Sequence, residues 1–119
     1  MSDTVGIDID ILMDAACGDQ DLAIDLVKLF FDLTGQEQTR LADAVAQGNA
    51  ASASDVAHKI AGSCASCGMS ELAARCRELE QLCKKEIPDD VDGRLKEINQ
   101  GIQEVRCSLE THFNCSLAP

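Results

Sequence analysis

The sequence contains no tryptophan, no tyrosine and only three phenylalanines, so aromatic side chains contribute little to its interior. No run approaches the ~20 consecutive apolar residues that a membrane span needs, and no basic-then-apolar start indicates a signal peptide. Ten basic residues against twenty-one acidic ones give a formal net charge of -11. Nucleic acids and anionic membranes are disfavoured as partners, because both bind positive surfaces. Because neither a membrane span nor a signal peptide is indicated, we expect a cytoplasmic protein.

Proline is scarce as well, and no internal repeat or low-complexity segment divides the chain. Its 119 residues suffice for one domain with a modest core, so a single domain over residues 1–119 is expected. The starting methionine and the length of the chain favour a free-standing protein over a segment of a longer one.

The seven cysteines are an odd number at irregular spacing, which does not indicate a disulfide framework. Four of them fall on the apolar faces of helical patterns, where a free cysteine packs as a small hydrophobic residue: Cys64, Cys67, Cys76 and Cys83. The CxxC that begins at Cys64 has no second spaced pair, whereas a zinc site usually has four converging ligands. Core packing is favoured, with a metal or redox sensor as the alternative.

Apolar residues recur at helical spacing along most of the chain, and no segment alternates convincingly as a strand does. The pattern predicts a short helix over residues 8–17, stopped by Gly18, and then a helix capped by Asp19. This second helix is expected to be buried on two sides and to be kinked or broken at residues 34–35. Its two apolar sets are Leu22, Leu26, Leu29, Phe30 and Leu33 on one face and Ile24, Val27 and Phe31 off it.

Three more segments have helical period. One runs from about residue 51 to 67, where Gly68 follows it; the next is expected to be capped by Ser70, and the last to begin at Asp89 or Asp90. Four long amphipathic helices with short connections predict an all-α protein. The expected architecture is an antiparallel four-helix bundle with a short additional N-terminal helix over one end or flank.

His58 lies about 140° round its helix from the middle of the apolar stripe, so its ring should project to solvent. Gly62 lies one turn further on, and a glycine within a helix costs about 1 kcal/mol relative to alanine. Clearance beside the imidazole, where another protein's active site could approach, would explain that glycine.

Residues 56–80 carry a pattern that spans two helices and the turn between them: Ala57, His58, Ile60, Gly62, Ser63, Gly68, Leu72, Cys76, Leu79 and Glu80. The pattern resembles the histidine-containing phosphotransfer (HPt) domains of multistep phosphorelays. One position departs from it, because many family members have lysine three residues after the histidine and this chain has Ala61. The nearest base is Lys59.

The resemblance implies a phosphoryl carrier rather than an enzyme. His58 would accept the phosphoryl group from the aspartyl-phosphate of a receiver domain and pass it to another receiver. The receiver would supply Mg²⁺, so no cofactor or metal of the chain's own is expected. Gly62 would give clearance for the phosphoryl group, and Lys59 would offset its charge. Ser63 would hydrogen-bond either within the turn or to the phosphoryl oxygens. Glu80 would orient the ring, and Gly68 would allow the tight turn between the helices.

The implied partners are response-regulator receiver domains and a hybrid sensor histidine kinase. The large charge and the lack of an evident apolar surface favour a monomer. Ala61 leaves a second hypothesis open, in which the chain binds receivers without accepting phosphate.

Overall fold

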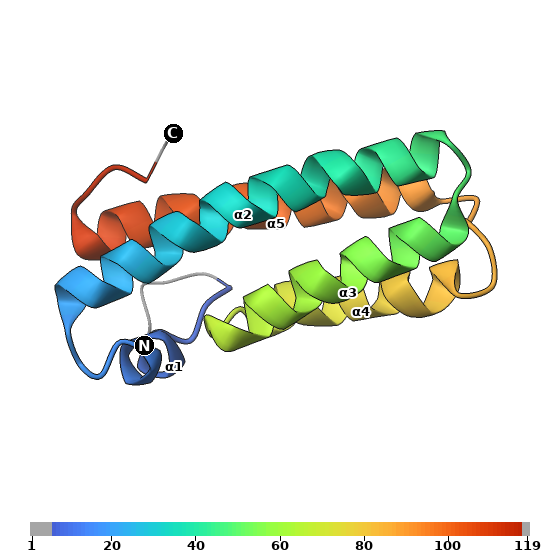
Figure 1. The fold of residues 1–119 in the computed structure, drawn as a ribbon. Coiled ribbons are helices and arrows are strands. Elements are labelled where there is room, and N and C mark those ends of the chain that lie inside the picture. The colour runs from blue at the N-terminus through green and yellow to red at the C-terminus, as the bar shows by residue number, and fades with distance from the viewer. Residues whose placement is uncertain (1–5, 118–119) are drawn as a thin grey trace.

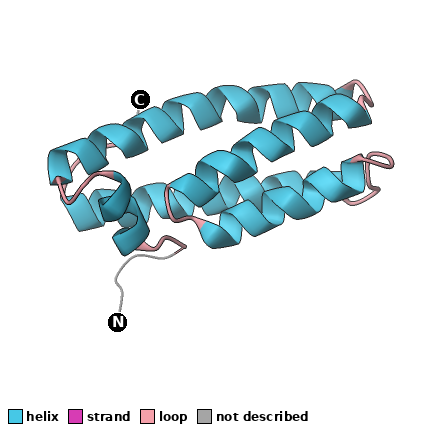
Figure 2. Cartoon of the chain, turned by 60° about the horizontal axis from the view of Figure 1, so that its bottom comes forward, coloured by secondary structure: helices cyan, strands magenta, loops and turns pink. Residues whose placement is uncertain are grey.

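The computed structural model describes residues 6–117, and helix is the only regular secondary structure in that range. A short helix precedes four long ones: α1 (Ile9–Ala15), α2 (Gln20–Ala46), α3 (Ala50–Ser66), α4 (Ser70–Cys83) and α5 (Val91–Phe113). Successive long helices run in opposite directions (Figure 1), joined by short loops at the two ends (Figure 2). Both α2 and α4 contact α3 and α5, which gives a four-cornered bundle. The predicted all-α helical bundle is confirmed.

The helix α1 covers one end of the bundle, where it contacts α2 and α3 (Figure 1). The chain just before it is tied to the α3–α4 turn, because the Asp8 amide donates a hydrogen bond of 2.8 Å to the Gly68 carbonyl. Gly68 has φ +83°, and a Cβ there would lie 2.5 Å from the carbonyl oxygen of Asp8. A side chain at this position would clash with the backbone, so the turn requires glycine.

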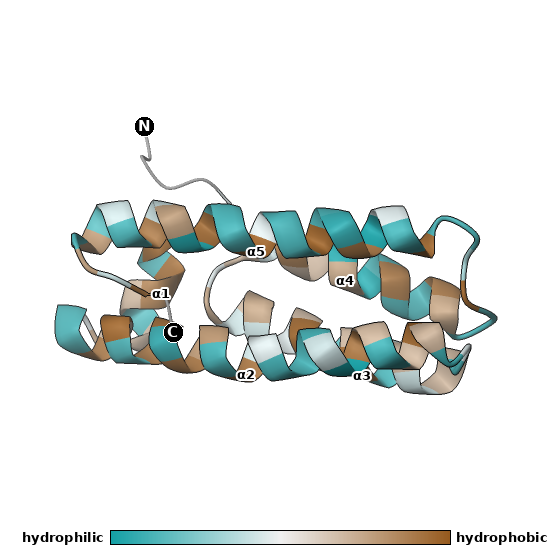
Figure 3. Ribbon diagram, turned by 90° about the horizontal axis from the view of Figure 1, so that it is seen from above, coloured by the Kyte–Doolittle hydropathy of each residue, from teal (hydrophilic) through white to brown (hydrophobic). Residues whose placement is uncertain are grey.

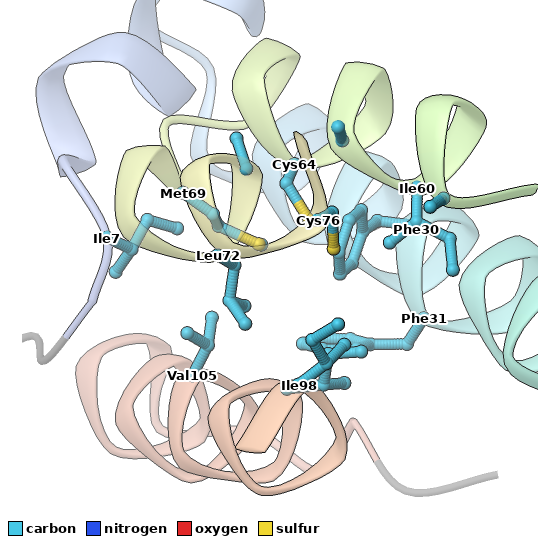
Figure 4. Close-up of a cluster of buried hydrophobic side chains, with 14 of the residues drawn as sticks. Ile7, Phe30, Phe31, Ile60, Cys64, Met69, Leu72, Cys76, Ile98 and Val105 are labelled. Atoms are coloured by element: carbon cyan, nitrogen blue, oxygen red, sulfur yellow. The ribbon is translucent and has the colours of Figure 1, made fainter. Parts of the chain in front are cut away.

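The core is aliphatic and rich in thiols, as the close-up in Figure 4 shows. Cys64, Cys76 and Cys83 are at most 1% exposed, which confirms their predicted packing. A hydrogen bond between the thiols of Cys64 and Cys76, together with burial, raises the pKa of Cys64 far above its usual range. Two thiols that pair with each other satisfy their weak polarity within a dry interior.

Two predictions for α2 are wrong. The helix runs unbroken through residues 34–35, and the Thr34 side chain is buried at 2% exposure. The helix is also not buried on both apolar sides, since Leu22, Leu29 and Leu33 are 41%, 53% and 48% exposed. Apolar residues are visible on the outer side of the bundle as well as inside it (Figure 3). The prediction that the protein lacks an apolar surface is therefore also wrong.

Helix boundaries were predicted to within a few residues, but not every cap. The Asp19 carboxylate accepts a hydrogen bond of 3.2 Å from the Leu22 amide, as a capping side chain should. The α4 helix instead follows Met69, one residue before the expected cap, and neither Met69 nor Asp90 makes a capping side-chain hydrogen bond.

Candidate functional site

His58 lies on the outward side of α3, and its side chain is 73% exposed. The neighbouring residues Ala57, Ile60 and Ala61 are at most 2% exposed and hold this helix against the bundle. The predicted exposure of the imidazole is confirmed. Ala61 occupies the position where many HPt domains have lysine, and in this chain that position faces the interior.

The carboxylate of Glu80 in α4 contacts the His58 ring at Nδ1. Glu80 is only 8% exposed, and its Oε2 lies 3.1 Å from Nδ1 of His58. An ionised carboxylate only accepts hydrogen bonds, so Nδ1 of the neutral ring must be the donor and must carry the proton. The other ring nitrogen, Nε2, then has a free lone pair. Within residues 6–117 it has no hydrogen-bond partner.

Two further contacts hold Glu80 in place. The buried hydroxyl of Ser54, one turn before His58 on α3, donates a hydrogen bond of 3.0 Å to the Glu80 backbone carbonyl. The Lys84 ammonium lies 3.7 Å from Glu80 Oε2, the same oxygen that faces the ring. The first contact sets the register between α3 and α4, and the second acts on the carboxylate itself.

A groove between α2 and α3 runs beside the ring. It brings the predicted residues Lys59, Gly62 and Ser63 together with His58. Its other wall is an apolar strip of α2: Leu26, Leu29, Phe30 and Leu33. Glu80 lies beneath the ring on α4, and Gly68 lies at the α3–α4 turn, outside the groove.

Within the part of the chain that the structure describes, no close packing contact explains why residue 62 is glycine. A Cβ built on it would meet no other atom within 4 Å, apart from its own helix backbone and neighbours. Alanine would therefore fit, and by helix propensity it would stabilise α3 by about 1 kcal/mol. The open space lies in the groove that holds His58, where the glycine leaves room for something from outside the chain.

Sequence reasoning missed three contributors to this site. Leu29 and Leu33 were expected to face the core, and the surplus of apolar residues on α2 was the available signal. The position of Lys84, four residues after Glu80 on one helix face, could have indicated their contact. Within residues 6–117, no group of three or more His, Cys, Asp or Glu side chains is arranged to hold a metal ion. No helix in that range is long and apolar enough to cross a membrane.

Comparison with known proteins points to one family. Residues 25–107 match the model of the family described as Hpt domain, a stretch that includes both His58 and Glu80. No curated protein matches the sequence. The structure of histidine-containing phosphotransfer protein B from Pseudomonas aeruginosa PAO1 is similar, with a TM-score of 0.84 and 19% sequence identity. The similarity covers 92% of this chain and 96% of that one.

The contact with Glu80 predicts the tautomer of His58. In the neutral ring the proton should be on Nδ1, because the facing carboxylate cannot donate one. The ¹⁵N chemical shifts of the two ring nitrogens, measured by NMR with the ring neutral, report this directly. His112 is exposed and serves as a control within the same sample, since no carboxylate of residues 6–117 is hydrogen-bonded to its ring. A His58 ring with its proton mainly on Nε2 would contradict the proposed geometry.

Proposed function

Since this chain belongs to the Hpt domain family and is a phosphocarrier of a phosphorelay, we propose that His58 is the residue that carries the phosphoryl group. One observation supports the assignment above all others. The imidazole is 73% exposed, and a buried carboxylate holds its Nδ1 while Nε2 has no partner in the described structure. A ring held in this way presents one nitrogen to an incoming protein.

In the accepting step, Nε2 of the neutral imidazole attacks the phosphorus of a receiver's aspartyl-phosphate. The N–P bond forms as the P–O bond breaks, and the aspartate carboxylate leaves with the electron pair. Phosphoryl transfer passes through a loose, charge-spread transition state, so catalysis consists mainly of positioning and electrostatic stabilisation. We propose that the receiver supplies the Mg²⁺ for this step, while this chain supplies the oriented ring.

In the donating step, the aspartate carboxylate of a second receiver attacks the same phosphorus. The electrons of the N–P bond return to Nε2. Because Nδ1 keeps its proton against Glu80, the group that leaves is a neutral imidazole rather than an imidazolate. The same hydrogen bond therefore assists transfer in both directions.

Lys59 and Ser63 are exposed and line the groove beside the ring. We propose that the Lys59 ammonium offsets the charge of the phosphoryl oxygens and that the Ser63 hydroxyl donates a hydrogen bond to them. Ala61 carries no charge and is 2% exposed, so the compensating cation must come from another position such as Lys59.

The apolar wall of the groove supports an assignment of the docking surface. Leu29 and Leu33 are half exposed beside the proposed phosphoacceptor, and exposed apolar patches of this kind mark interaction sites. We propose that a receiver domain covers this strip of α2 when its aspartate reaches His58. We further propose that the protein is cytoplasmic. We also propose that it is a monomer, because a net charge of -11 opposes association between copies of the chain.

The assignment of His58 is tested by label transfer. Incubation with a ³²P-phosphorylated receiver should give the wild type an acid-labile, base-stable label. His58→Ala should take up none, while the control His112→Ala should be labelled as the wild type is. Label on His58→Ala would refute the assignment. A stable complex without label on the wild type would favour the hypothesis of a receiver-binding protein that accepts no phosphate.

We expect that Gly62 lowers the stability of the protein and keeps the groove beside His58 open. Gly62→Gln should raise the free energy of unfolding by about 0.5–1 kcal/mol, because glutamine is the better helix former, and should slow transfer at least about tenfold by filling the groove. Gly35→Gln is the matched control, since Gly35 also lies within a helix and its Cβ would meet open space. It should stabilise similarly and leave transfer unchanged. Urea unfolding and the rate of label uptake measure the two effects, and equal transfer rates in the two variants would contradict this role of Gly62.

The docking surface is tested with Leu29→Gln, which replaces a side chain that is 53% exposed. We expect little loss of stability but receiver binding at least about fivefold weaker, because apolar burial of roughly 1 kcal/mol is lost at the interface. Ile11→Gln is the control, since Ile11 is 41% exposed but does not line the groove. Calorimetric titration with a receiver measures both. Equal affinities in the two variants would place the docking surface elsewhere.

A further inference from the structure

We propose that Lys84 is a positioning residue for phosphotransfer, which acts on His58 through Glu80. The inference rests on the proposed role of His58 as the phosphoacceptor. In the proposed role, Lys84 touches neither the phosphoryl group nor the receiver. Its task is to hold the Glu80 carboxylate in the orientation that presents Nε2 of the ring.

The two contacts of the carboxylate converge on a single atom. Oε2 of Glu80 lies 3.1 Å from His58 Nδ1 on α3 and 3.7 Å from Lys84 Nζ on α4. The Glu80 side chain is only 11% exposed. A carboxylate with so little access to water needs partners for its charge.

The two partners differ in what they supply. The neutral imidazole gives Glu80 a hydrogen bond but no net positive charge. Within residues 6–117, Lys84 is the one Lys or Arg whose nitrogen lies within 4.0 Å of this carboxylate. The Lys84 ammonium supplies that positive charge, and its contact with Glu80 does not involve Nε2, the ring nitrogen proposed to take the phosphoryl group.

The backbone of Glu80 is already fixed, which leaves the side chain as the part that Lys84 controls. Ser54 on α3 donates its hydrogen bond to the Glu80 carbonyl, and this bond is independent of the carboxylate orientation. The carboxylate itself can still turn about its side-chain torsions. Lys84 lies four residues further along the same helix, at the C-cap of α4, and draws Oε2 toward the position where it also meets the ring.

Loss of Lys84 should therefore loosen the hold on the ring. Whenever the carboxylate turns away, Nδ1–H loses its protein acceptor, and the tautomer with its proton on Nε2 becomes more populated. That tautomer cannot attack phosphorus through Nε2, because its lone pair is on Nδ1. Lys84 is 55% exposed, and exposed ion pairs are weak, so the effect should be a factor of about two to five.

The test compares three variants of the full chain. Lys84→Met removes the charge and keeps much of the side-chain length. Lys85→Met is the matched control, because Lys85 is the next residue, is equally outside the groove and makes no ion pair in the described structure. Lys84→Arg restores a cation at the same position. Each is examined by ¹⁵N NMR of the His58 ring and by label transfer from a phosphorylated receiver over a range of receiver concentrations.

We expect Lys84→Met to lower the population of the Nδ1–H tautomer and to slow transfer about two- to fivefold at saturating receiver. The receiver concentration for half-maximal rate should stay unchanged. Lys84→Arg should restore both properties, and Lys85→Met should match the wild type. Wild-type tautomer populations in Lys84→Met, or an equal effect of Lys85→Met, would overturn the proposal. The two proposals fail separately, because a wild type without label refutes the role of His58, whereas the NMR comparison tests Lys84 without any transfer.

Discussion

The site depends on one hydrogen bond between neighbouring helices, from Nδ1 of His58 to the carboxylate of Glu80. An exposed imidazole alone can turn freely and exchange its proton between two nitrogens. Here the ring is exposed but its partner is buried, so the rigid interior of the bundle fixes the orientation of a group at the surface. The Ser54 hydroxyl ties the backbone of Glu80 to α3, which makes the distance across the two helices a property of the fold.

The surface around the His58 ring includes residues that packing within the chain does not explain. The glycine at position 62 forgoes helix stability that alanine would give, and the exposed leucines of α2 leave apolar side chains in contact with water. Both lie along the same groove beside His58. Residues of this kind beside the proposed phosphoacceptor are explained by our proposal that a receiver domain covers the groove. The chain thus combines a rigid support beneath the ring with an open, apolar approach beside it.

Sequence reasoning could predict the helices, their order and the exposure of His58, because helical periodicity marks which residues face the core. It could also single out Glu80, but only through the resemblance to HPt domains. Periodicity failed at Leu29 and Leu33, since it detects apolar faces and does not tell whether this chain or a partner covers them. It also could not show that Thr34 is buried, because a single polar residue packs inside a helix bundle whenever its surroundings allow it.

The contact of Ser54 with Glu80 could not be predicted from the sequence, because it depends on the register of two helices. The i,i+4 spacing of Lys84 could indicate a contact with Glu80, but not which carboxylate oxygen it meets, because that depends on a side-chain orientation. The proposed chemistry requires Glu80 to hold Nδ1 of His58 and to leave Nε2 free for phosphorus. The most direct test is the ³¹P–¹⁵N coupling pattern of the phosphorylated protein with ¹⁵N-labelled imidazole. We predict phosphorus on Nε2 of His58 and a proton on Nδ1; phosphorus on Nδ1 would contradict the account.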